Sequence, residues 1–338
     1  MPSGLSTTGG IRLLRSDIGY IGRDLQRPEC VLTTASGDVF CSGFDRGVIR
    51  ICPDGRQYYL APPTEVGGLP SLANGFALRP DGSFLVANIA DGGGLLELDA
   101  DGYRMFHDCA LSSASPPVNF VLVDALGKIW ITVSSTFSPR SLAYNRETAN
   151  GYIATIENGR MNIVAEGLAY TNEIRPDYDG GWLYIAETMG QKISRIRLDE
   201  KGLHGAPEDF AHMSPGGFVD GLELDCEGHL LATCIVTSEL IRIDPDGGKT
   251  TVASDRHQDW VEDVQLTFEA GQMGRPQLDQ TPAKQLRNIS SLAFFGEDRA
   301  QIVCGNLLDT QLPVLTAPAP GREPPHWGVS VPQWGAEF

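Results

Sequence analysis

Short runs of alternating apolar and polar residues recur along the whole chain, and each is broken by a turn that contains glycine. A representative unit is NGFALRPDGSFLVANIADGGGLLELDADG, which starts at Asn74. It reads as a polar residue, an alternating strand, a PDG turn, an apolar strand, a loop and a third strand. Glycine supplies the positive φ that a tight hairpin turn needs. Each unit therefore predicts several short antiparallel strands.

The unit recurs along the chain, the last copy being degenerate. Its copies begin at Glu29, Asn74, Asn119, Asn172, Asp220 and Ser290, at intervals of 45, 45, 53, 48 and 70 residues. Four-stranded antiparallel blades repeated at such a period form a β-propeller. We therefore predict an all-β fold, a six-bladed β-propeller that makes one domain of residues 1–338. The N-terminal IRLLRSDIGYIG has no full unit, and we expect it to complete the last blade and close the ring.

The segment of about residues 256–287 departs from the strand pattern. Trp260, Val261, Val264 and Phe268 fall at helical spacing, and Gly271 is expected to end the helix. This predicts a short helical insertion between blades five and six. We expect it to cover one mouth of the channel, with Trp260 contacting substrate. The alternative is that it packs on the side of the propeller and fills the gap between blades.

The residues that start the units are expected to meet in space. In a propeller the innermost strand of each blade lines the channel, so equivalent first positions converge at one mouth. All six carry oxygen and none is positive; we call them the mouth ring: Glu29, Asn74, Asn119, Asn172, Asp220 and Ser290. Two carboxylates at one point repel each other unless a cation lies between them. Oxygen ligands without His or Cys favour Ca²⁺, Mg²⁺ or Mn²⁺. For any single copy, ordinary turn chemistry is the alternative explanation.

Composition excludes several classes of partner. The formal net charge of −17 argues against nucleic acid and anionic membrane surfaces. No stretch is apolar enough to span a membrane, and no signal-peptide pattern opens the chain, although a leader could be missing from the sequence. The seven cysteines are scattered without metal-type spacing, which favours a reduced, cytoplasmic setting. Serine-hydrolase, P-loop and zinc-protease motifs are not found.

The chain resembles the senescence marker protein 30 and gluconolactonase family, the regucalcin group of six-bladed propellers, over essentially its whole length. The resemblance is carried by Glu29 in RPECVL, Asn119 in PVNFVLVD, Asn172 in YTNEIRPD and Asp220 in FVDGLELD. It implies that these four residues hold one divalent metal ion, with Ca²⁺ expected first and Mn²⁺, Mg²⁺ or Zn²⁺ as alternatives. It also implies lactone hydrolysis, with Asp220 as the catalytic residue.

Two departures from the family pattern concern the substrate. Pro117 stands where sugar-lactone members tend to carry arginine, and Phe120 where an acidic residue is frequent, which argues against simple gluconolactone recognition. Glu173 follows Asn172 where the family often has glycine. We expect its side chain to point outward into solvent, and the alternative is a general acid or base that contacts substrate. Asn74 and Ser290 are expected to hydrogen-bond substrate or simply to fill the channel.

The function predicted from these features is metal-assisted hydrolysis of a small-molecule lactone or ester. In it, a bound ion polarises the carbonyl and activates water, while Asp220 holds the ion and steers or deprotonates that water. Two alternatives stay open: a metal-free propeller of the strictosidine-synthase type that forms carbon bonds, and a ligand-binding propeller without catalysis. The sequence leaves open which lactone is opened and what the oligomeric state is.

Overall fold

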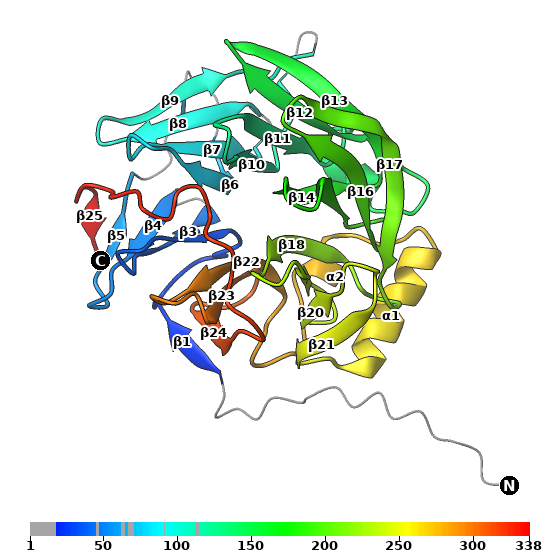
Figure 1. The fold of residues 1–338 in the computed structure, drawn as a ribbon. Helices are drawn as coiled ribbons and strands as arrows, with labels where there is room; N and C mark the ends of the chain where they lie inside the picture. Colours follow the sequence, from blue (N-terminus) through cyan, green and yellow to red (C-terminus); the bar gives the residue numbers. More distant parts are fainter. Residues whose placement is uncertain (1–17, 45–46, 62–64, 67–70, 91, 112–114) are drawn as a thin grey trace, which may run out of the picture.

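A computed structural model describes residues 18–44, 47–61, 65–66, 71–90, 92–111 and 115–338. Six antiparallel sheets surround a central axis in this part of the chain, so the predicted six-bladed β-propeller is confirmed (Figure 1). Within a blade the strands follow chain order from the channel outward, except that the N-terminal strand forms the outer edge of the last blade. Four predicted unit starts, Asn74, Asn172, Asp220 and Ser290, are the second residue of an innermost strand. Glu29 precedes its strand by two residues and Asn119 precedes its strand by one.

The strands of the first three blades have the following bounds. Blade one contains β2 (Val31–Thr33), β3 (Val39–Ser42), β4 (Val48–Ile51) and β5 (Gln57–Tyr59), joined by β25 (Ala336–Glu337). Blade two contains β6 (Ala73–Leu78), β7 (Phe84–Asn88), β8 (Leu95–Asp99) and β9 (Gly102–His107). Blade three contains β10 (Phe120–Val123), β11 (Ile129–Val133), β12 (Gly151–Glu157) and β13 (Arg160–Leu168).

The last three blades continue the same arrangement. Blade four contains β14 (Thr171–Asp177), β15 (Trp182–Glu187), β16 (Lys192–Asp199) and β17 (Gly202–His212). Blade five contains β18 (Val219–Leu224), β19 (Leu230–Cys234), β20 (Glu239–Ile243) and β21 (Lys249–Ser254). Blade six contains β22 (Ile289–Phe295), β23 (Gln301–Asn306), β24 (Leu312–Thr316) and β1 (Gly19–Ile21).

Burial follows the position of a strand within its blade. Every residue of β7 is buried, because the strand lies between neighbouring strands and is covered on both faces by adjacent blades, whereas β9 at the outer edge is half exposed. Apolar residues from several blades share one cluster that includes Phe40, Phe84 and Trp130. The inter-blade contacts are therefore apolar, and the polar residues are left for the channel ends and the outer edges.

The ring is closed by the N-terminal strand, as predicted. β1 pairs antiparallel with β24, with Gly19 opposite Val314 and Ile21 opposite Leu312. The remainder of the predicted closing segment, residues 11–17, lies outside the described residues. Pairing of the first strand with the last blade links the two ends of the chain, so that blades one and six cannot separate without breaking β-sheet hydrogen bonds.

The C-terminal segment packs against one end of the channel, a feature that the strand pattern does not predict. Gly321 forms a bridge with Asp225, which follows β18, and Arg322 Nη1 lies 2.6 Å from Asp177 Oδ1 at the end of β14. Trp327 accepts a backbone hydrogen bond from Ala35, just beyond β2. These contacts are at the ends of the inner strands, so this segment lies at the mouth opposite the mouth ring.

The predicted helical insertion is present between β21 and β22. It contains α1 (Gln258–Glu269) and α2 (Arg275–Leu278), and Gly271 follows α1 with a φ of 67°. Val264 and Phe268 are buried, and the Phe268 ring meets Phe218 at a centroid distance of 5.0 Å. Figure 1 shows both helices beside blade five. Among the described residues, no helix is long and apolar enough to cross a membrane.

Candidate metal and active site

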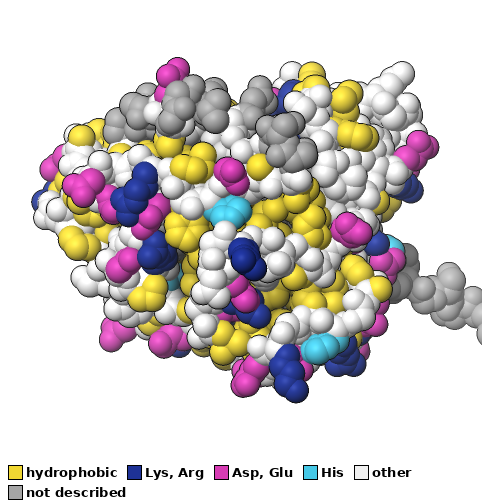
Figure 2. Space-filling view, turned by 90° about the horizontal axis from the view of Figure 1, so that it is seen from above, with side chains coloured by type: hydrophobic (Ala, Val, Ile, Leu, Met, Phe, Trp, Pro, Cys, Tyr) yellow, Lys and Arg dark blue, Asp and Glu magenta, His cyan; other side chains and the backbone are white. Residues whose placement is uncertain are grey.

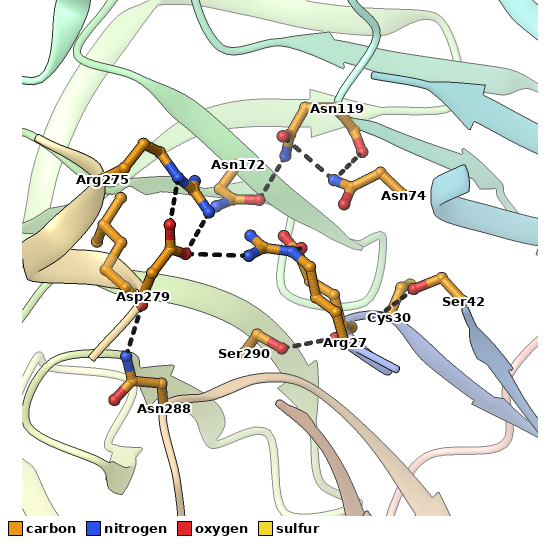
Figure 3. Close-up of polar contacts among 12 residues, drawn as sticks. Arg27, Cys30, Ser42, Asn74, Asn119, Asn172, Arg275, Asp279, Asn288 and Ser290 are labelled. Atoms are coloured by element: carbon orange, nitrogen blue, oxygen red, sulfur yellow. Dashed lines mark hydrogen bonds and ion pairs between the residues drawn. The ribbon is translucent and has the colours of Figure 1, made fainter. Parts of the chain in front are cut away.

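Hydrogen bonds connect five of the six mouth-ring residues from blade to blade, in two groups that leave out Asp220. Asn74 Nδ2 donates to the backbone oxygen of Asn119 at 2.9 Å, and Asn119 Nδ2 donates to Asn172 Oδ1 at 2.5 Å. Ser290 Oγ donates to the backbone oxygen of Glu29 at 2.6 Å. Figure 3 shows the amides of blades two, three and four following one another around the mouth. The convergence expected from the repeat therefore occurs in the structure.

Glycines let the inner strands approach closely enough for this convergence. A Cβ atom at Gly75, next to Asn74, would lie 2.7 Å from the Cα of Phe120 in the neighbouring blade. At Gly221, next to Asp220, it would lie 2.4 Å from the backbone oxygen of Ser290. Both distances are too short for any side chain, so the Asn-Gly and Asp-Gly pairs of the sequence have a packing role. They bring oxygen ligands from adjacent blades together.

Asp220 is a buried carboxylate without a hydrogen-bond partner. Its exposed fraction is 5%, and no described residue donates a hydrogen bond to it. Burial, followed by the nearby Glu29 and Glu173 carboxylates, raises the pKa of Asp220 well above its usual range, against the opposing charges of Arg27 and Arg140. Buried carboxylates are normally paired, because an unpaired one is costly. A cation bound between Asp220 and Glu29 would supply the missing partner.

Glu29 belongs to an ion-pair chain that the sequence did not predict. Arg27 Nε lies 2.9 Å from Glu29 Oε2, and Arg27 Nη1 lies 3.4 Å from Asp279 Oδ1. Arg275 Nε in turn donates to Asp279 Oδ2 at 2.8 Å (Figure 3). Asp279 directly follows α2, so the insertion does reach the mouth ring. No periodic pattern marks these residues, and only the folded loops bring them together.

Arg140 also reaches the mouth ring from outside the repeat. It starts a short 3-10 helix, η3 (Arg140–Ala143), in the long connection between β11 and β12. Its Nη1 donates to Asn119 Oδ1 at 3.3 Å. Position 117 is proline, and Arg140 brings a guanidinium to the mouth ring from this separate connection.

Glu173 is not solvated, so that expectation was wrong. Its exposed fraction is 3%, because the side chain packs against the inner strand of blade five. The backbone N–H of Leu222 donates to its Oε2 at 3.2 Å, and Arg175 Nη2 lies 3.4 Å away and also near Glu223. Burial raises the pKa of Glu173 to about 7, although Arg175 opposes the rise. A residue of this kind can hold or release a proton near neutral pH.

The other residues predicted to contact substrate lie in two different situations. Asn74 and Ser290 are buried in the mouth ring, where both donate hydrogen bonds to backbone oxygens of neighbouring blades. Trp260 lies on α1 and packs beside the apolar cluster that includes Val264 and Phe268. Among the described contacts, none joins Trp260 to the mouth ring. The insertion approaches the ring through Asp279 instead.

A second group of metal-type side chains lies at the opposite mouth. Single ligand atoms of Asp225, Glu227 and His229 all lie within 4.8 Å of one another. Arg242, however, donates to Asp225 Oδ2 at 2.8 Å and to Glu227 Oε2 at 2.5 Å, and it lies 2.8 Å from His229 Nδ1. A guanidinium already provides the positive charge there. The mouth ring, whose Asp220 has no such partner, is therefore the better candidate for a metal ion.

Known proteins resemble this chain in sequence. Residues 28–255 match the family described as SMP-30/Gluconolactonase/LRE-like region. A 6-deoxy-6-sulfogluconolactonase of Pseudomonas putida is 26% identical over 185 residues, which are 53% of this chain and 60% of that protein. The match thus covers less than two thirds of the relative's own length.

Solved structures share the fold along nearly the whole chain. A calcium-binding regucalcin from Agrobacterium tumefaciens superimposes with a TM-score of 0.61 at 20% identity, covering 90% of this chain and 97% of that one. A gluconolactonase from Xanthomonas campestris gives a TM-score of 0.64 at 18% identity, covering 89% of each chain. At these identities the likeness establishes the fold alone.

Proposed function

Since the chain belongs to the SMP-30/gluconolactonase/LRE-like family, we propose that it is a divalent-metal-dependent hydrolase that opens the ring of a lactone. The observation that carries the proposal is the buried carboxylate of Asp220, which has no hydrogen-bond donor among the described residues and lies near the Glu29 carboxylate in the mouth ring. Gluconolactonases among its relatives support the reaction class.

The donor set suits a hard divalent ion. Glu29, Asn119, Asn172 and Asp220 would hold it, because they offer two carboxylates and two amides from four blades. Two negative charges balance a divalent cation, and the calcium-binding neighbour makes Ca²⁺ the first choice. When bound, the ion would polarise the lactone carbonyl and lower the pKa of a water molecule.

The protein's own groups would perform the proton transfers. Asp220 would orient the attacking water and accept its proton on a carboxylate oxygen, which requires that carboxylate to be ionised. Below it, Glu173 is hydrogen-bonded by Leu222 and has a pKa near neutrality, about 7, so it can exchange a proton with the ring above. Asn74 would keep Asn119 in place through its hydrogen bond at 2.9 Å.

The metal site can be located by elemental analysis of protein purified without chelator. We expect about one equivalent of a divalent ion per chain, as for a single site of this donor set. Asp220→Ala should lose the ion, whereas Glu227→Gln, at the opposite mouth, should keep it. An ion lost from Glu227→Gln and kept by Asp220→Ala would place the metal in the second group, and protein that takes up no ion would contradict the proposal.

The reaction can be tested on a panel of lactones with acid release as the readout. The panel should include neutral sugar, aliphatic and aromatic lactones. It should also include a sulfonated gluconolactone, because the Pseudomonas putida relative is a 6-deoxy-6-sulfogluconolactonase. We expect ring opening that is abolished by chelator and restored by Ca²⁺ or Mn²⁺. Hydrolysis that persists after the ion has been removed would separate the reaction from the metal site.

A further inference from the structure

Arg140 is a cation beside the mouth ring whose charge is not balanced by an ion pair. It is partly buried at the start of η3, and its Nη1 donates a single long hydrogen bond, 3.3 Å, to Asn119 Oδ1. Among the described residues, no carboxylate lies within 4.0 Å of its guanidinium. A guanidinium has five N–H donors, so most of those on Arg140 are left for another partner.

The other arginines of the mouth differ from Arg140 in this respect. Arg27 is paired with both Glu29 and Asp279, and Arg275 is paired with Asp279. These carboxylates balance the charges that lie beside them. Of these three arginines, Arg140 is thus the one that can meet a charge brought by a ligand. Arg146, in the same connection, also has no ion pair among the described residues, but its Nη2 donates to Gln191 Oε1 at 3.2 Å and not to the mouth ring.

A tyrosine hydroxyl extends the donor surface around Arg140. Tyr144 and Tyr170 are buried and their rings meet edge to face at a centroid distance of 5.4 Å. Burial by itself would raise the pKa of Tyr144, but the charge of Arg140 and a hydrogen bond with Arg275 lower it below its usual value. The Tyr144 hydroxyl therefore lies within the field of both guanidiniums, of which that of Arg275 is paired with Asp279 and that of Arg140 has no ion pair among the described residues.

The unpaired charge of Arg140 contrasts with the net charge of the whole protein. The chain carries a formal charge of −17, and Figure 2 shows acidic side chains interspersed with basic ones over the visible face. An overall negative field repels an anionic ligand. The unpaired guanidinium beside the mouth ring is therefore a local positive charge, and it would counteract that repulsion where the substrate binds.

We propose that Arg140 binds an anionic group of the substrate, a carboxylate, sulfonate or phosphate, and thereby makes an acidic lactone the preferred substrate. This inference rests on the proposed lactone hydrolysis and specifies its substrate class. The planar guanidinium fork matches such oxygen groups through two parallel hydrogen bonds. A neutral lactone would bury the same guanidinium without compensating its charge, which costs free energy.

The test measures binding, so that it does not depend on turnover. The probes are a neutral tetrahydropyran polyol and the same ring carrying a terminal carboxylate, sulfonate or phosphate; lacking an ester bond, none can be opened. Their affinities for the Ca²⁺-loaded protein are measured by titration calorimetry. We expect at least one charged ring to bind about tenfold to a hundredfold more tightly than the neutral ring, the range for hydrogen bonds to a charged group.

Variants assign this preference to a residue. Arg140→Gln should remove the preference for the charged ring and leave the affinity of the neutral ring unchanged. Arg140→Lys should keep part of it, because the charge remains while the fork geometry is lost. Arg160→Gln, an exposed position on β13 of the same blade, should behave as the parent protein. Circular dichroism checks folding, and if Arg140→Gln does not fold, Arg140→Lys alone must reduce the preference.

Equal binding of neutral and charged rings by the parent protein would overturn the inference. An equal loss for both rings in Arg140→Gln would also overturn it, because Arg140 would then bind the ring or the carbonyl rather than an anion. Failure of the proposed function is distinguishable: a protein that prefers the charged rings but opens no lactone would contradict hydrolysis and support the anion site.

Discussion

At the residue scale, Asp220 concentrates the chemistry of this mouth. The carboxylate is buried without a donor, so it is stable as an anion only when a cation is nearby, and its elevated pKa expresses that cost. The side chain also belongs to the only Asp-Gly pair at the start of an inner strand in the described repeat, where Gly221 allows close contact with Ser290. The packing of the inner strands therefore fixes the position of Asp220, and a nearby cation would determine whether its carboxyl group is ionised.

We predict that Asp220→Asn lowers kcat at least about a hundredfold, because the amide cannot act as a general base. The substitution keeps the size of the side chain and one oxygen ligand, so folding should be preserved. Steady-state kinetics on the best lactone of the panel would measure the effect, with Glu227→Gln as the control variant. Unchanged kcat in Asp220→Asn would remove this residue from the mechanism.

Glu173 predicts a pH dependence of stability. Its pKa rises from 4.5 to about 7 on folding, so the folded state favours the neutral carboxyl. The stability gained by holding this proton is fully present below pH 4.5 and is lost as the pH rises through about 7. In the metal-free protein, Glu173→Gln should therefore gain free energy of unfolding relative to the parent between these values, by up to about 3 kcal/mol.

Denaturant unfolding at several pH values, with chelator present, measures this difference. The control is Glu157→Gln, whose side chain is half exposed at the end of β12 and should show a difference that does not vary with pH. A pH-independent difference for Glu173→Gln would mean that the buried carboxyl is ionised throughout the range.

At the element scale, one part of the insertion packs firmly on the propeller and another part contacts the mouth. α1 is fixed by the apolar contacts of Val264 and Phe268 and by Gln265 Oε1, which accepts the backbone N–H of Gly216 at 2.7 Å. Beyond α2, Asp279 contacts Arg27 at the mouth ring. The expectation that this segment covers the mouth and sets substrate choice stays a prediction. Asp279 is the residue through which it can be tested.

We predict that Asp279→Asn shifts relative kcat/KM values across the lactone panel by about fivefold, the scale of a partly exposed ion pair, while metal content stays the same. The charge of Arg275 would then be freed toward the substrate, while Arg27 would stay paired with Glu29. Leu266→Ala, on the exposed side of α1, is the control and should leave the preference unchanged. Identical preferences in the parent protein and Asp279→Asn would favour the alternative that the insertion only fills the gap between blades.

At the scale of the whole molecule, closure of the ring depends on the short pairing of β1 with β24. The pair joins residues that are 295 positions apart in sequence, Gly19 and Val314. Blade six thereby gains its outer strand from the opposite end of the chain. Loss of this pairing would expose the edge of β24 and loosen the contact between blades six and one.

A disulfide between positions 19 and 314 should lock the ring. A Cβ at Gly19 would lie 3.7 Å from the Cβ of Val314, within the range of natural disulfides. Oxidised Gly19→Cys/Val314→Cys, made with Cys226→Ser to remove the exposed thiol, should gain about 2–5 kcal/mol in free energy of unfolding. Denaturation with and without reductant measures the gain, with Gly19→Cys/Cys226→Ser as control. A gain that survives reduction would not come from closure.

The sequence by itself determined the repeat, the blades, the insertion helix and the residues of the mouth ring. These features follow from local properties: alternation predicts strands, Asp-Gly pairs predict turns, and a change to helical spacing marks α1. Repetition then converts local patterns into a global prediction, since equivalent positions of a closed ring must meet at the axis. Repetition marks all six mouth-ring positions in this way, and the resemblance to the family singles out Glu29, Asn119, Asn172 and Asp220 among them.

The tertiary structure decided what surrounds that ring. The burial of Glu173 depends on the neighbouring blade, where Leu222 donates to it, although an isolated glutamate reads as a surface residue. Arg140 and Asp279 lie on irregular segments, whose conformation has no periodic signal in the sequence. Their charges act on the site only because the closed ring brings loops from separate blades to one mouth, and distances between such loops are set by the packing of the whole propeller.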